Sequence, residues 1–99
     1  MKTPVIVGAA ECDLGVTNKS ILELQAQAVS RALADAGLKI SDVDGIATNA
    51  ISRFSASSLA DYLGIEPKFT DSTFAGGSSF EMYVARAYLA VASGQCNVV

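Results

Sequence analysis

Residues 76–95 read GGSSFEMYVARAYLAVASGQ and carry the clearest structural signal in the chain. Two glycines break the chain, and Ser78 and Glu81 then have the spacing of a capping box at the start of a helix. The helix is expected to run to about Ser93, where Gly94 ends it, and only two of its residues are charged. Because a helix that is apolar on all sides has to be buried on all sides, we expect it to lie between layers of a larger protein.

The rest of the chain alternates between strand and helix patterns. Residues 5–10 are apolar and begin with β-branched side chains, as in a strand buried on both faces of a parallel sheet. Ser20 and Glu23 form a second capping-box pattern before an amphipathic helix that Gly37 ends. The expected order is a strand at 5–10, a helix at 21–36, a turn at 41–45, a strand at 46–48, an irregular stretch at 49–56, a short helix at 59–63 capped by Ser57 and Ser58 and ended by Gly64, a strand at 68–73, the helix at 79–93 and a strand at 97–99.

This alternation predicts an α/β fold, and the chain stops inside its last strand. We therefore interpret residues 1–99 as the leading part of a longer polypeptide, incomplete in this chain. The alternative is a small self-contained α/β domain that dimerises through the apolar helix.

Composition excludes several classes of function. The 99 residues are 51% hydrophobic and 17% charged, with a net charge of -3 and no histidine, so nucleic-acid binding and imidazole chemistry within the chain are not expected. The two cysteines, Cys12 and Cys96, lie far apart without metal-ligand spacing and are interpreted as reduced thiols. No signal peptide and no membrane span are predicted, and the default location is cytoplasmic.

Four stretches together resemble a known family. They are residues 5–11, residues 31–37, residues 41–46, and residues 76–95 with Val98 and Val99 beyond. In order and spacing they resemble the N-terminal part of thiolase-superfamily proteins, and most closely the thiolase-like proteins related to sterol-carrier thiolases and non-specific lipid-transfer proteins.

The resemblance implies a layered α/β/α/β/α fold, of which residues 1–99 would be an N-terminal fragment of the N-terminal domain. It also implies a homodimer in which the Lys68–Thr73 strand pairs with its two-fold mate. The substrate would be a coenzyme A thioester, with no bound cofactor and no metal. Related proteins often work with a small partner subunit that combines a zinc ribbon with a nucleotide-binding fold.

The chain departs from the family at the nucleophile. In working thiolases an acylated cysteine opens the buried helix, where the helix N-terminus lowers the pKa of a thiol. Here that slot falls on Gly77, and no cysteine occurs between Cys12 and Cys96. The candidate ligand-binding residues are Gly76, Gly77, Ser78 and Ser79.

Within this group, Ser78 is a weak candidate nucleophile, because a hydroxyl needs a general base and none is near in sequence. Capping of the helix is the role we expect for it. Gly76 and Gly77 are interpreted either as giving a thioester room to approach the backbone or as simple turn residues.

Three functions remain open from the sequence. The first is a thiolase-like enzyme without the usual cysteine that cleaves or forms a carbon–carbon bond in coenzyme A thioesters, as in a retro-aldol reaction. The second is a conventional thiolase or acyltransferase with a displaced nucleophile. The third is a non-catalytic carrier of acyl-coenzyme A or lipid, or a scaffold subunit.

Overall fold

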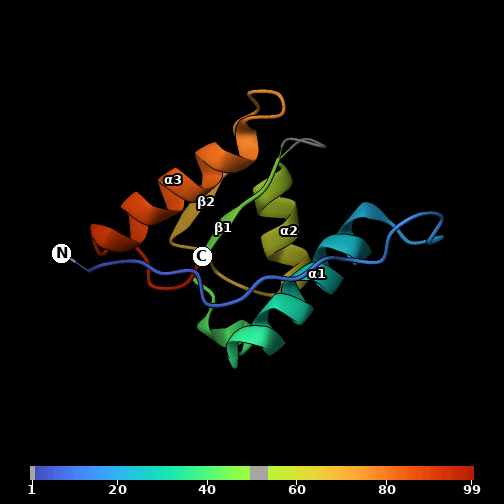
Figure 1. Ribbon diagram of the computed structural model, residues 1–99, viewed down its shortest axis with the longest axis horizontal. Helices are drawn as coiled ribbons and strands as arrows, with labels where there is room; N and C mark the ends of the chain where they lie inside the picture. Colours follow the sequence, from blue (N-terminus) through green and yellow to red (C-terminus); the bar gives the residue numbers. More distant parts are fainter. Residues whose placement is uncertain (1, 50–53) are drawn as a thin grey trace.

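Three helices and two short strands make up the described part of the chain, residues 2–49 and 54–99 of a computed structural model (Figure 1). A single 3-10 turn at Ile40–Asp42 lies where the sequence predicts a turn. The alternation of helices and strands confirms the predicted α/β class. The elements are α1 (Ile21–Ala36), β1 (Gly45–Ala47), α2 (Ser55–Leu63), β2 (Phe69–Asp71) and α3 (Ser79–Ala92).

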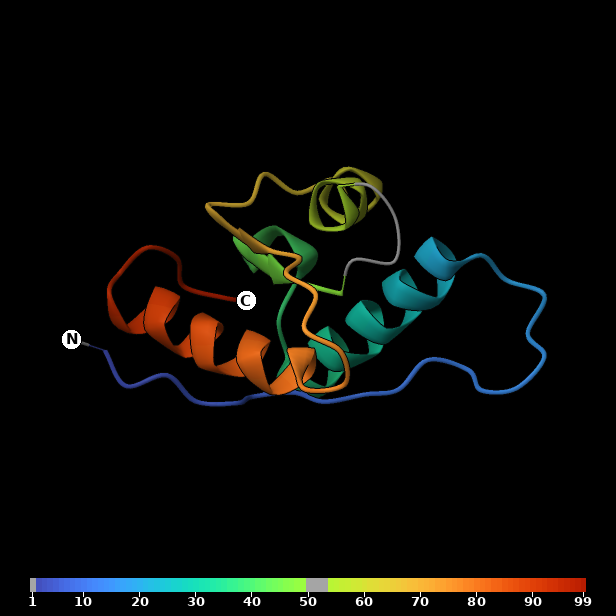
Figure 2. The same ribbon diagram turned by 90° about the horizontal axis from the view of Figure 1, so that it is seen from above.

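The two strands form a parallel pair. Ile46 lies opposite Thr70, and α2 provides the crossover that a parallel connection requires. In both overall views the pair lies between α3 and α2 (Figure 1 and Figure 2). The core is small: Ile46 packs with Ala56, Leu59 and Ala60 from α2, and apolar residues of α1 and of the end of α2 pack around them.

Helix α1 matches its sequence signals. The Ser20 hydroxyl accepts a hydrogen bond from the Glu23 backbone N–H at 3.1 Å. At the other end Gly37 has a φ of 71°, a left-handed conformation that favours glycine, and its N–H donates to the Ala34 and Leu33 carbonyls. Both ends of α1 are therefore set by residues at the predicted positions.

The Ser20→Ala variant is expected to lose about 1 kcal/mol of unfolding free energy, because the Glu23 N–H loses its acceptor. The matched control is Ser30→Ala, an exposed position in the middle of α1 where alanine favours the helix slightly. Denaturant titration of both variants checks the difference. Equal midpoints for the two variants would show that Ser20 does not act as a cap.

The strand predicted at residues 5–10 is wrong. This segment is extended, but it pairs with no strand among the described residues, and Val5 and Ile6 are 74% and 81% exposed. It runs across the molecule beside α3 and α1 (Figure 2). A backbone group of this segment forms a hydrogen bond with a side chain of α1, because the Ala9 N–H donates to the Asp35 carboxylate at 3.1 Å.

The strand predicted at 97–99 is also wrong, and the carboxylate of Asp44 is the reason. Its oxygens accept hydrogen bonds from the backbone N–H groups of Asn97 and Val98 at 2.8–3.0 Å. The Val98 carbonyl accepts from the N–H groups of Asp44 and Gly45. These bonds hold residues 97–98 against the start of β1 through a side chain and a single carbonyl, without a strand ladder.

One helix differs from its predicted bounds. Helix α2 begins at Ser55 instead of Leu59, and it has no side-chain cap, because the Ser58 N–H donates to the Phe54 carbonyl and starts the helix one turn earlier. Its end at Gly64 is as predicted. Residues 50–53 of the predicted irregular stretch lie outside the described residues.

Helix α3 is not buried on all sides. Its buried residues are Ser79, Tyr83, Ala90 and Ala92, whereas Phe80, Val84, Tyr88 and Leu89 are at least half exposed. In the described part of the chain α3 contacts β1, and these four side chains keep at least half of their surface exposed. The predicted strand at 68–73 is confirmed for its inner residues, 69–71.

Candidate ligand-binding site

The loop of residues 72–78 leaves the carboxyl end of β2 and leads into α3. In sheets of parallel strands this edge is where ligands usually bind. The loop is exposed at its tip, from Thr73 to Ser78, and buried at both ends, at Asp71 and Ser79. The four residues singled out from the sequence therefore lie together at the tip of this loop and the start of α3.

The two glycines of the loop have different roles. Gly76 has a φ of 67°, in the left-handed region that a side chain adopts at a cost. Gly77 does not have a positive φ, and a Cβ built on it would meet no atom within 4 Å. Gly76 thus shapes the turn, and Gly77 leaves open space at the position where the resemblance places a cysteine.

The capping box predicted from Ser78 and Glu81 does not form. The Ser78 hydroxyl donates to the Ala75 carbonyl at 3.0 Å, and α3 has no side-chain cap at its start. The neighbouring Ser79 is the residue that fixes the turn. Its hydroxyl accepts from the Ala75 N–H at 2.7 Å and donates to the Gly76 carbonyl at 2.8 Å, and the side chain is almost fully buried.

These contacts reverse the expected order of importance of the two serines. Ser79→Ala is expected to cost between about 1 and 2 kcal/mol of unfolding free energy, because it removes the two hydrogen bonds that an almost fully buried hydroxyl makes to Ala75 and Gly76. Ser78→Ala is the matched control and is expected to cost less. The Ser78 hydroxyl is exposed, so water can replace it as the hydrogen-bond donor to the Ala75 carbonyl. Thermal unfolding of both variants measures the difference, and a larger loss for Ser78→Ala would contradict the assignment.

A charged pair closes the base of the loop. Both carboxylate oxygens of Asp71 accept from Nη1 of Arg86, at 3.0 and 3.1 Å, and one also accepts from the Thr73 N–H at 2.9 Å. Burial acts to raise the pKa of the Asp71 carboxyl, but the hydrogen bonds from Thr73 and Arg86 and the charge of Arg86 outweigh it and lower that pKa. Asp71 is therefore a buried anion with its partner in place.

The sequence analysis does not predict this pair. A signal was present: Ser79, Tyr83 and Arg86 recur at positions i, i+4 and i+7 of a helix whose other residues are mainly apolar. Such spacing places three polar side chains along one face.

Neither cysteine belongs to the site. Cys96 follows the far end of α3, a helix about 20 Å long at 1.5 Å per residue, whereas Gly77 precedes its start, and Cys96 is 1% exposed. Burial, together with the charge of Asp44, raises the pKa of the Cys96 thiol. Cys12 is half-buried in the N-terminal segment, and both cysteines are free thiols, as predicted.

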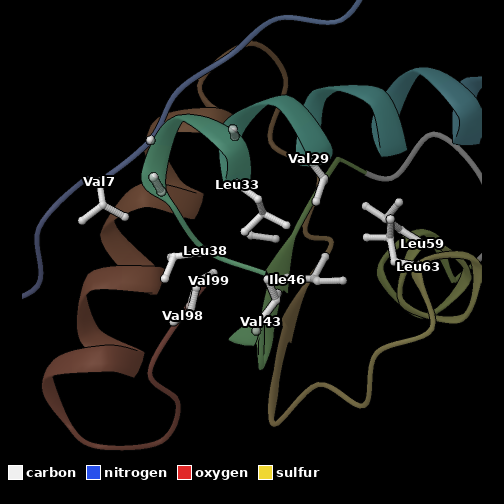
Figure 3. A pocket seen from close by; sticks show the side chains of 15 residues that line it. Val7, Val29, Leu33, Leu38, Val43, Ile46, Leu59, Leu63, Val98 and Val99 are labelled. Atoms are coloured by element: carbon white, nitrogen blue, oxygen red, sulfur yellow. The ribbon is translucent and has the colours of Figure 1, made fainter. Parts of the chain in front are cut away.

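An apolar cavity of about 200 Å³ lies elsewhere, between α1, β1 and the two ends of the chain (Figure 3). Val29, Leu33, Ile46 and Val98 point into it from these elements. Its lining residues carry no ionisable side chain, so it supplies packing space and no chemistry. Across residues 2–49 and 54–99, His, Cys, Asp and Glu side chains form no group suited to a metal ion. No helix in that part of the chain is long and apolar enough to cross a membrane.

Two curated proteins are similar in sequence to this chain. A steroid side-chain-cleaving aldolase from Thermomonospora curvata is 39% identical over 94 residues, which are 94% of this chain and 24% of that protein. A 17-hydroxy-3-oxo-4-pregnene-20-carboxyl-CoA lyase from Mycobacterium tuberculosis is 38% identical over 96 residues, 95% of this chain and 25% of that protein. The chain thus spans about a quarter of the length of the curated relatives it matches.

Solved structures give the same relationship. The Ltp2-ChsH2(DUF35) aldolase matches 90% of this chain and 23% of its own with a TM-score of 0.73 and 37% identity. A monomeric SCP2-thiolase-like protein from Mycobacterium smegmatis matches 95% of this chain and 21% of its own, with a TM-score of 0.72 and 27% identity. The chain is related to thiolase-like proteins. No family model matches the sequence. The fold is a mixed helix-and-strand part of a thiolase-like architecture, as the sequence predicts.

Proposed function

We propose that this chain is part of a thiolase-like lyase that cleaves a carbon–carbon bond in a coenzyme A thioester by a retro-aldol reaction. One observation carries the proposal. The resemblance places the nucleophile position of thiolases at Gly77, which is an open position before α3, and the two cysteines of the chain lie elsewhere. The relatives named as an aldolase and a CoA lyase support the same reaction class.

A retro-aldol reaction needs no acyl-enzyme bond. A base removes the proton from a hydroxyl group on the β-carbon of the acyl chain, and the bond between the α- and β-carbons breaks. The β-carbon becomes a ketone, and the electron pair passes to the thioester as an enolate, which takes up a proton at its α-carbon. The negative charge that develops on the thioester oxygen is the charge that an enzyme has to stabilise.

The loop before α3 is suited to this task. Backbone N–H groups at a helix N-terminus are partly positive and face outward, and Gly77 has no side chain to obstruct an approaching thioester. Gly77 thereby has the first of the two roles considered for the glycines, giving the thioester room, whereas Gly76 is a turn residue and Ser79 holds the turn. Ser78 has no role as a nucleophile in this proposal.

We also propose the wider organisation that the resemblance implies. Residues 1–99 would form the first part of a thiolase-like N-terminal domain in a cytoplasmic protein. The edge of β2, in the Lys68–Thr73 segment, would pair with its two-fold mate in a homodimer. A small subunit with a zinc ribbon would be the partner, and the solved relative named Ltp2-ChsH2(DUF35) aldolase, which carries two protein names, supports this part of the proposal.

Dependence on free coenzyme A separates retro-aldol cleavage from thiolysis. The complete protein is incubated with 17-hydroxy-3-oxo-4-pregnene-20-carboxyl-CoA, the compound named for one relative, with and without added coenzyme A. The proposal predicts a ketone and a shortened acyl-CoA in equal amounts without added coenzyme A. Cleavage only when coenzyme A is added would instead support a conventional thiolase, and binding without cleavage would support a carrier.

A further inference from the structure

One face of α3 contacts the segment that precedes it at three levels. Near the start of the helix the Ser79 hydroxyl contacts the Ala75 N–H and the Gly76 carbonyl. One turn later the Tyr83 hydroxyl donates to the Thr73 carbonyl. At the third level Arg86 donates from Nη1 to the Thr73 hydroxyl at 2.7 Å and to the Asp71 carboxylate.

The two sets of residues have matching periods. Positions 79, 83 and 86 lie on one face of a helix, and positions 71, 73 and 75 are alternate residues of an extended segment. The segment therefore runs antiparallel to α3 and is bonded to it at every second residue. The side chain between these anchors, Phe74, is 70% exposed.

We propose that Tyr83 and Arg86 are positioning residues that set the conformation of the Gly76–Gly77 turn through the Thr73 anchor. The proposal rests on the proposed function in one respect, that the thioester binds at this turn. Neither residue needs to touch the substrate. Tyr83 holds the carbonyl of Thr73, and Arg86 holds its hydroxyl. Only three residues separate Thr73 from Gly77.

The residues at the base of these contacts are buried. Tyr83 is 6% exposed and Asp71 is 8% exposed, whereas Thr73 and the turn are exposed. A rigid base below an open tip is the arrangement that keeps backbone donors aimed at one point without closing the site.

A cysteine at the tip provides a test that does not depend on catalysis. In the Gly77→Cys background, the pKa of the new thiol reports how closely the N-terminal amides of α3 are held around the sulfur. The pKa is obtained from the pH dependence of alkylation by iodoacetamide. Peptide mass spectrometry resolves this site from Cys12 and Cys96.

Tyr83→Phe in this background is expected to raise the pKa of the introduced thiol enough to cut the alkylation rate at pH 7 roughly threefold. The matched control is Tyr88→Phe, which removes the same hydroxyl from a half-exposed residue elsewhere on α3. The control is expected to leave the thiol unchanged. Thr73→Val, which removes the hydroxyl that accepts from Arg86 and leaves the Asp71 carboxylate as its acceptor, is expected to act like Tyr83→Phe and serves as the second variant if that protein does not fold.

If Tyr83→Phe lowers the melting temperature but leaves the pKa of the thiol at position 77 unchanged, Tyr83 has only a structural role, and this result would overturn the proposal. Equal thiol pKa values in the Tyr83→Phe and Tyr88→Phe variants would do the same. Failure of the proposed function is a separate outcome. Complete proteins that cleave no CoA thioester, with or without these changes, would remove the lyase assignment and leave the thiol measurements intact.

Discussion

The Gly77→Cys variant is expected to carry a thiol that reacts with iodoacetamide roughly tenfold faster at pH 7 than an unperturbed cysteine. The backbone at Gly77 accepts a side chain without strain, because its φ is not positive and a Cβ would meet no atom within 4 Å. The sulfur would lie at the N-terminus of α3, where the partial positive charge of the helix favours the thiolate.

Ser93→Cys is the matched control for this variant. Ser93 is the exposed C-terminal cap of the same helix, where the partial charge is negative and the thiol pKa is expected to rise. Alkylation followed peptide by peptide compares the two introduced thiols. If the thiol at 77 reacts no faster than the thiol at 93, the start of α3 does not favour an anion, and the proposed site loses its electrostatic basis.

The Asp71→Asn variant is expected to lose about 2 kcal/mol of unfolding free energy at pH 7, the usual worth of hydrogen bonds to a charged group. The change removes a buried carboxylate that accepts from Arg86 and the Thr73 N–H. Asp61→Asn, on the exposed side of α2, is the matched control and is expected to stay within about 0.5 kcal/mol of the parent.

The loss of unfolding free energy caused by Asp71→Asn is expected to be larger at neutral pH than in acid. The pKa of the Asp71 carboxyl is lower in the folded protein than its ordinary value, so the charged form stabilises the fold. This stabilisation is fully present above the unfolded-state pKa of about 4 and is lost as the pH falls through the folded-state pKa. Urea titrations at several pH values measure it, and an equal loss at pH 7 and at pH 2 would contradict the role of the charge.

The local features of the fold could be predicted from the sequence. Helix α1 is the clearest example, since its cap at Ser20, its apolar periodicity and its stop at Gly37 all lie within one short segment. The end of α2 at Gly64 and the break before α3 were predictable for the same reason.

Features that depend on distant partners were not predictable. Residues 5–10 have a strand's composition, but a strand also needs a neighbour, and here Ala9 bonds to Asp35 of α1. Residues 97–98 are held by Asp44, more than fifty positions earlier in the chain. The pattern of side chains within a segment carries no information about such a contact.

The candidate site was predicted in position and not in its contacts. The loop from Gly76 to Ser79 was identified from its glycines and serines, but the capping role assigned to Ser78 failed because its hydroxyl bonds back to Ala75. The anchors Asp71 and Arg86 are fifteen positions apart and meet only because the loop folds back along α3. Polar residues at helical spacing on an apolar helix were a signal for Arg86 only, because Asp71 lies at the end of β2.

Peptide mass spectrometry of the complete protein during turnover tests the central claim most directly. The protein is incubated with 17-hydroxy-3-oxo-4-pregnene-20-carboxyl-CoA, quenched in acid, digested and searched for acyl groups on the two residues of the Gly76–Ser79 segment with a hydroxyl, Ser78 and Ser79. The account predicts that these residues stay unmodified while the thioester is cleaved. An acyl adduct on Ser78 or Ser79 that forms and decays at the rate of turnover would contradict it.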